Sequence, residues 1–298
     1  MQSASKMTSL GTVGKYMHDN AIVGFTSDSL LNVLELMSKY YIRHLPILDE
    51  EYNIYRIVTD KDLIDLVCVL PTLKTMIMTM DKLPSQKVIT ISKDDDIVYA
   101  ILQMTKNVIS CLPVMEDNSI VGIITISDIL RIDKLWAELP NTEINPYDRV
   151  LGHAITSLMK ITPDHSLWQI LDLLKSSEIR NLLVTDRFET ITGVVSSQQV
   201  IFEIIDYHRR LRHIRKSISF EHYLFNTTLE HVMVPMPLSI EAPSHVKDIR
   251  DLLISDSPTA ILVGSPEHPS GLITERDLYH YLTHNLDKLK TLRQVYST

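Results

Sequence analysis

One order of local elements recurs four times along this 298-residue chain, and this repetition constrains the fold more than any other feature. Each copy spans roughly sixty residues and contains a short strand, an amphipathic helix, a second strand, a turn, a third strand and a closing helix. Alternating helices and strands with short connections predict an α+β fold built of α/β repeats. A three-stranded sheet with an open face cannot bury its apolar surface alone, so we expect the copies to associate in pairs.

The first helix of each copy carries apolar residues at helical spacing. In the first copy, the residues on this face are Leu30, Val33, Leu34 and Met37. The segments predicted to form these helices are 29–40, 95–106, 166–179 and 245–256. The helix of the first copy follows a predicted strand, AIVGF, at 21–25. A strand of this composition forms part of a core by default.

The four copies occupy about 13–68, 76–134, 150–205 and 229–285. The segment 135–149 contains two prolines, which makes it the best candidate for a domain boundary. We therefore expect two halves, 1–140 and 141–298, with two copies in each half.

Each copy ends with a strand, a Thr or Ser, two further residues, an acid and an apolar helix. The segments with this pattern are IVTDKDL at 57–63, GIITISDIL at 122–130, GVVSSQQVI at 193–201 and GLITERDLY at 271–279. The third copy departs from it, because Gln199 stands at the position of the acid. These motifs and the order of elements, over about residues 13–285, resemble the cystathionine-beta-synthase (CBS) domain, whose repeats pair into Bateman modules.

Four such repeats in one chain look most like the gamma subunit of AMP-activated protein kinase and the stand-alone prokaryotic four-repeat proteins. The resemblance implies that the two halves are two Bateman modules arranged as a flat disc, with nucleotide clefts between paired repeats. It also implies a regulatory rather than a catalytic protein.

A carboxylate at the start of a helix can accept hydrogen bonds from both hydroxyls of a ribose. Three closing helices have such an acid, and the Thr/Asp pairs are Thr59 with Asp62, Thr125 with Asp128, and Thr274 with Asp277. The same spacing is also typical of a capping box that needs no ligand. Both interpretations remain open from the sequence.

The resemblance implies that phosphate is bound by the partner repeat, just before its central strand. This pairs Asp128 with Arg43 and His44, and Asp277 with Arg180 and Asn181. Arginine offers phosphate a rigid fork of donors, and histidine adds positive charge when it is protonated. For the Asp128 cleft, the resemblance places Ala21, Ile22 and Val23 around adenine.

The other two clefts look poorer. Asp62 would face Ser110 and Cys111, which offer no positive charge, so we expect at most weak nucleotide binding there. Gln199 would face Thr259 and Ala260, and we expect that cleft to stay empty.

The net charge of −8 opposes attraction to a nucleic acid or to an anionic membrane. One exception is the basic run HRRLRHIRK at 208–216, which is typical of a solvated helical face but could also reach phosphates or dock an acidic partner.

We expect a regulator that binds AMP, ADP or ATP and signals to a partner protein or within a homodimer; S-adenosylmethionine stays open as the ligand. The alternative is a metabolite-responsive regulator that contacts DNA or RNA through 208–216.

Several function classes have no support in the sequence. It contains no HExxH, no Cys/His pairs at zinc-finger spacing, no GxxxxGKS/T loop and no G-x-S-x-G motif. We therefore expect neither an enzyme nor a metal site, and no catalytic cofactor. Cys68 and Cys111 lie in apolar segments, which favours buried free thiols over a disulfide. The lack of a signal or membrane segment predicts a cytoplasmic protein.

Overall fold

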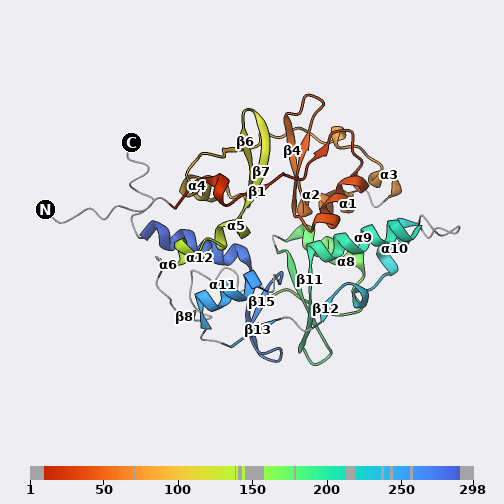
Figure 1. Cartoon of the computed structure of the whole chain (residues 1–298). Helices are drawn as coiled ribbons and strands as arrows, with labels where there is room; N and C mark the ends of the chain where they lie inside the picture. Colours follow the sequence, from red (N-terminus) through yellow and green to blue (C-terminus); the bar gives the residue numbers. More distant parts are fainter. Residues whose placement is uncertain are drawn as a thin grey trace.

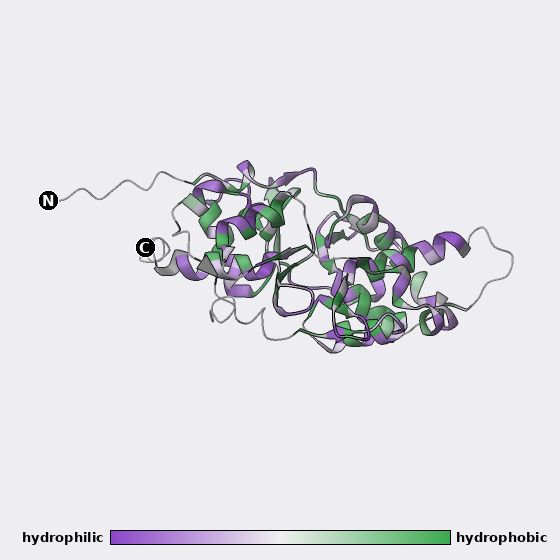
Figure 2. Ribbon diagram, turned by 90° about the horizontal axis from the view of Figure 1, so that it is seen from below, coloured by the Kyte–Doolittle hydropathy of each residue, from purple (hydrophilic) through white to green (hydrophobic). Residues whose placement is uncertain are grey.

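The four copies lie around a common centre (Figure 1). The computed structural model describes residues 10–69, 72–137, 139, 143–144, 158–177, 179–211, 219–235, 238–241, 244–255 and 258–288. Seen from below, the body is thinner than in the first view, and apolar and polar residues alternate along its helices (Figure 2). The predicted α+β fold of paired repeats is confirmed.

The same elements recur in all four repeats. The first contains β2 (Gly24–Phe25), α1 (Leu30–Tyr40), β3 (His44–Leu48), β4 (Ile54–Thr59) and α2 (Asp60–Val69). The second contains β5 (Ile91–Ser92), α4 (Ile97–Asn107), β6 (Cys111–Glu116), β7 (Ser119–Thr125), α5 (Ile126–Leu130) and α6 (Asp133–Ala137). The third contains β9 (Lys160–Ile161), α8 (Leu167–Ser176), β10 (Asn181–Thr185), β11 (Ile191–Ser196) and α9 (Ser197–Leu211). The fourth contains β13 (Ser239–Ile240), α11 (Val246–Ser255), β15 (Ile261–Gly264), β16 (Pro269–Ile273) and α12 (Glu275–Lys288).

The remaining elements are short and precede or connect the main helices and strands of the repeats. They are η1 (Val13–Lys15), β1 (His18–Asp19), α3 (Leu73–Met76), η2 (Met80–Lys82), β8 (Glu143–Ile144), α10 (Phe220–Asn226), η3 (Leu229–His231), β12 (Val234–Pro235) and β14 (Ser244–His245).

The helices form where the periodicity predicts them, because local signals fix their starts and their buried faces. Ser29 caps α1, Asp96 caps α4 and Ser166 caps α8, each by accepting a bond from a backbone N–H of the first turn. The four apolar residues named for the first helix are all buried.

The opening segment of one repeat pairs with the sheet of its neighbour. Strand β1 lies at the start of the first repeat but runs antiparallel to β7 of the second repeat. In the same way, β12 lies at the start of the fourth repeat and pairs with β11 of the third. These exchanges tie the first repeat to the second and the third to the fourth.

The predicted strand at 21–25 is shorter than expected, and only β2, residues 24–25, pairs with β3. The reason is the exchange just described: β1 belongs to the sheet of the second repeat, so the chain must cross back to the first. Asn20 has φ 56°, and residues 21–23 make the crossing without a strand partner.

The two large apolar cores cross between the halves of the chain. One joins the second and fourth repeats and the other joins the first and third, with α2 packed against α8 and α9, and α5 against α12. The halves 1–140 and 141–298 therefore share their cores. The proposed boundary at 135–149 lies largely outside the described residues and stays a prediction.

Within the described part of the chain, each helix is too short or too polar to span a lipid bilayer.

Candidate functional site

A cavity of about 1180 Å³ lies where the repeats meet, and residues from all four repeats line its walls. Ligand pockets usually measure about 300–1,000 Å³, so this cavity is large enough for a nucleotide-sized molecule. Three acid-bearing motifs reach it: its walls include Thr59 and Asp62, Thr125, and Thr274 with Asp277.

The closing helices begin with one shared geometry. Oδ2 of Asp128 accepts bonds from the backbone N–H of Thr125 at 2.8 Å and from its hydroxyl at 2.7 Å. Asp62 and Asp277 use Oδ2 in the same way, at 2.8 and 2.6 Å. In the third repeat, Oε1 of Gln199 accepts a bond from the N–H of Ser196 at 2.6 Å. The acids therefore do form caps, and each cap uses only one of the two carboxylate oxygens.

The second oxygen has a different environment in each cleft. Oδ1 of Asp128 lies 2.8 Å from Nε2 of His18, and Oδ1 of Asp62 lies 3.4 Å from Nη2 of Arg56. Among the described residues, no group bonds to Oδ1 of Asp277. Burial raises the pKa of Asp277, although the two bonds from Thr274 act in the opposite direction. Among the three aspartates, Asp277 is thus the one whose second oxygen has no partner among the described residues.

The residues assigned to adenine by the resemblance lie only partly at the cavity. Ala21 and Ile22 line it, whereas Val23 is not part of its wall. Asp128 itself is only 4% exposed at its side chain, and its neighbours Thr125 and Ser127 form the surface there.

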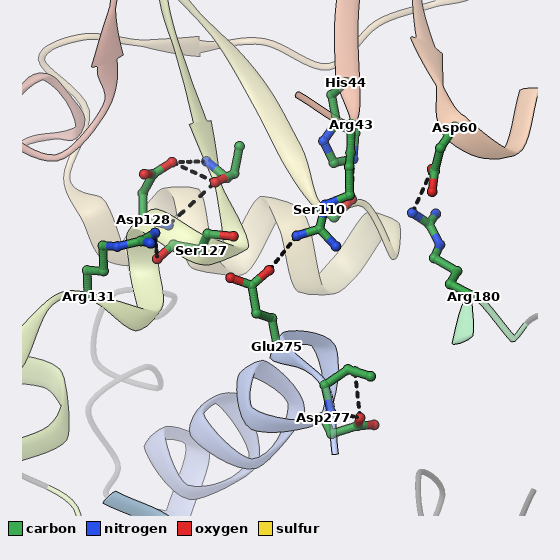
Figure 3. A network of polar contacts seen from close by, with 12 residues as sticks. Arg43, His44, Asp60, Ser110, Ser127, Asp128, Arg131, Arg180, Glu275 and Asp277 are labelled. Carbon is green, nitrogen blue, oxygen red and sulfur yellow. Dashed lines mark hydrogen bonds and ion pairs between the residues drawn. The ribbon is translucent and has the colours of Figure 1, made fainter. Parts of the chain in front are cut away.

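The two arginines predicted to bind phosphate are held by carboxylates of other repeats (Figure 3). Nη2 of Arg43 lies 2.5 Å from Oε2 of Glu275, and Nη1 of Arg180 lies 2.8 Å from Oδ1 of Asp60. Both arginines line the cavity, but neither contacts the aspartate with which it was paired from the sequence. Asp60 and Glu275 are equivalent residues, each directly after the Thr of its motif, and this shared position was the signal that could have revealed them.

His44 also lines the cavity, and its Nε2 lies 2.7 Å from Oγ of Ser110. Burial, and after it the positive charge of Arg43, lowers the pKa of His44 to about 4. The protonated form in which His44 would add positive charge is therefore disfavoured at neutral pH, because an ionised imidazole would be desolvated beside two arginines.

Asn181 has an unmet hydrogen-bonding group at the cavity wall. Its Oδ1 atom is buried and has no hydrogen-bond partner among the described residues. A buried acceptor without a donor costs free energy, so a ligand that offers an N–H or O–H there gains affinity.

The clefts of Asp62 and Gln199, for which we expect weak or no binding, differ in whether their residues line the cavity. Asp62, Ser110 and Cys111 all line it, and burial raises the pKa of the Cys111 thiol to about 12. Gln199 does not line the cavity, and Ala260 packs into a small core between the sheets of the third and fourth repeats.

The basic run is only partly within the described residues. Arg210 forms ion pairs with Asp206 and Glu203 on α9, and 212–218 lie outside the described part of the chain.

The family model of the CBS domain matches residues 13–68, 80–134 and 152–206, which is more than half of the chain. This chain belongs to the CBS domain family. The structure places a fourth repeat of the same element order after the three matched CBS repeats.

Solved structures with the same fold span nearly the whole CBS chain. Protein MJ1225 of Methanocaldococcus jannaschii, described as a candidate archaeal homologue of γ-AMPK, has a TM-score of 0.75 at 18% identity and covers 91% of this chain and 99% of its own. An uncharacterized conserved protein from Pyrococcus horikoshii has a TM-score of 0.52 at 16% identity, with the same coverage. At such identities the likeness shows the fold alone.

One curated relative is an enzyme. The L-aspartate semialdehyde sulfurtransferase of Methanocaldococcus jannaschii is 30% identical over 112 residues, which make up 37% of this CBS chain and 21% of the enzyme. The matched segment thus spans about a fifth of that relative's length, so its activity does not carry over to this chain.

Proposed function

We propose that this CBS protein is a regulatory protein that binds adenine nucleotides, AMP, ADP or ATP, in its central cavity and signals their presence to a partner protein. The observation that carries the proposal is the Thr-capped carboxylate of the closing helix. In Asp277, one oxygen completes the helix cap, the other has no bond to a described residue, and the residue lines a cavity large enough for a nucleotide. The cap thus orients the carboxylate for ligand hydroxyls at no cost to the helix.

The cavity offers each part of a nucleotide a chemically suitable partner. Asp277 can accept the ribose hydroxyls, and Asn181 can accept a donor such as the adenine amino group. Leu158 and Met159 supply apolar surface for the base in the same cavity. Arg43 and Arg180 supply guanidinium groups for phosphate.

The position of the cavity explains how a bound nucleotide could signal to a partner. Since the cavity walls come from four repeats, a ligand that contacts several of them stabilises one relative orientation of the repeats over others. A partner protein can respond to that orientation. The shift between two orientations can be only as large as the difference in the ligand's affinity for them.

The test is an equilibrium titration with AMP of the full chain and of Asp277→Asn. Gln199 shows that a carboxamide oxygen supports this cap, so the Asn variant is expected to keep its helix while losing the charge. A bond to a charged group contributes about 1.5–3 kcal/mol, so one site should bind AMP roughly tenfold to a hundredfold more weakly.

Gln199→Ala is the matched control, because it changes a cap residue outside the cavity and should leave AMP binding unaltered. Normal AMP binding by both Asp277→Asn and Asp128→Asn would show that these carboxylates serve only as caps.

A further inference from the structure

We propose that Glu275 competes with the nucleotide phosphate for Arg43, and so determines how strongly its cleft distinguishes phosphorylated from unphosphorylated adenosine compounds. The inference rests on the proposed function and deepens it, because it assigns phosphate selectivity to a residue outside the Thr-x-x-Asp motif.

The first step is the position of the two acids. Closing helices begin directly after the Thr or Ser of each motif, and the residues there are Asp60, Ile126, Ser197 and Glu275. Only the first and fourth repeats have an acid at this position. In both cases the acid forms an ion pair with an arginine of a different repeat, just before that repeat's central strand.

The second step is that the two ion pairs differ in burial. Asp60 is 2% exposed at its side chain and also accepts a bond from the hydroxyl of Ser197, so this pair is fixed within the fold. Arg43 and Glu275 are 38% and 21% exposed, and both line the cavity. A ligand can therefore reach and separate Arg43 from Glu275, whereas Asp60 stays with Arg180.

The third step is the chemistry of the competition. Glu275 is held through Nη2 of Arg43, the donor edge that a phosphate would use for a two-point contact. A phosphate that takes this edge must displace a carboxylate, and the freed carboxylate then lies close to a second negative group. Adenosine has no such group, so Glu275 opposes AMP and leaves adenosine unaffected.

The pair also joins opposite halves of the chain. Glu275 is at the start of α12, two residues before Asp277, and Arg43 immediately precedes β3 (Figure 3). When phosphate displaces Glu275 from Arg43, a contact between the first and fourth repeats is lost. A phosphorylated ligand therefore changes the relative orientation of these repeats, whereas adenosine does not.

The experiment compares AMP and adenosine binding to the full chain and to Glu275→Gln by calorimetric titration at low salt. Glu275→Gln removes the competing charge and is expected to bind AMP roughly threefold to tenfold more tightly, with adenosine affinity unchanged. The gain should shrink at high ionic strength and vanish in an Arg43→Gln background.

Two further variants complete the design. Glu267→Gln removes the same charge from an exposed turn of the same repeat and should leave both affinities unchanged. Glu275→Ser places at this position the residue that the third repeat has there, Ser197, and should reproduce the gain if the glutamine variant folds poorly.

Unchanged or weaker AMP binding by the Glu275 variants, or an equal gain for adenosine, would overturn the inference and leave the proposed function intact. If neither compound binds the wild-type chain at millimolar concentration, the proposed function fails and this inference fails with it.

Discussion

Nε2 of His18 lies 2.8 Å from Oδ1 of Asp128, on the carboxylate oxygen that the helix cap leaves available. His18 belongs to β1, which pairs with β7 of the second repeat, so the exchange of this strand places the ring there. The Asp128 cleft thus has an internal hydrogen-bond donor where a ribose hydroxyl would bind. No such group contacts Asp277 in the described part of the chain.

The first prediction concerns this donor. His18→Ala should strengthen AMP binding at the Asp128 cleft by roughly twofold to tenfold, because the ligand no longer displaces a hydrogen bond from the carboxylate. Calorimetric titration of the variant and the wild type measures the effect. His268→Ala, which changes an exposed histidine of the β15–β16 turn, should have no effect. Weaker binding by His18→Ala would mean that the ring contacts the ligand instead.

The second prediction separates the two arginine pairs by stability. Asp60→Asn should lower the free energy of unfolding by about 2–4 kcal/mol, since it breaks a buried pair and leaves Arg180 without its counter-charge. Glu275→Gln should cost less than about 1 kcal/mol, because that pair is partly exposed. Urea denaturation followed by circular dichroism compares them, and equal losses would contradict the distinction.

The third prediction concerns acid stability. The folded-state pKa of His44, about 4, lies below the value of 6.5 expected for an unfolded chain, so unfolding takes up a proton between these pH values. The stability from the neutral ring is complete above pH 6.5 and is lost as the pH falls through 4. Between pH 7 and 4.5 we expect a loss of about 1–3 kcal/mol from this group. Urea denaturation at both pH values checks it.

His44→Asn is the control for acid stability, because Asn181 occupies the equivalent position of the third repeat. The variant should lose less stability than the wild type over the same pH range. Identical pH profiles would show that His44 titrates normally.

A fourth prediction follows from the backbone of Val108, which ends α4 with φ 55° and is 74% exposed. The left-handed region is costly for a β-branched residue and free for glycine. Val108→Gly should therefore raise the free energy of unfolding by about 0.5–1 kcal/mol, and Val108→Ala by less. Thermal unfolding of the three proteins tests this, and a destabilised glycine variant would contradict it.

The fold was largely predictable because its signals are local. Residues three and four apart, such as Leu30, Val33 and Leu34, determine which face of a helix is buried, wherever the helix packs. The cap geometry of Thr125 and Asp128 is likewise set within a single helical turn, so the sequence could place both residues correctly at the start of α5.

The partners of the charged groups were not predictable in the same way. Arg43 contacts Glu275, 232 positions away, and Arg180 contacts Asp60, 120 positions away. Resemblance to a family indicated which side chains could bind a nucleotide, but not which internal groups already bind those side chains.

The sequence by itself thus determined the four repeats, their amphipathic helices and the capped carboxylates, since each depends on neighbours within a few residues. Only the tertiary structure decided that β1 joins the second repeat, that the cores cross between the halves, and that His18 and Glu275 lie at the ligand-binding groups. The physical reason is that contacts between distant segments depend on how whole repeats pack, and no short pattern in the chain encodes that packing.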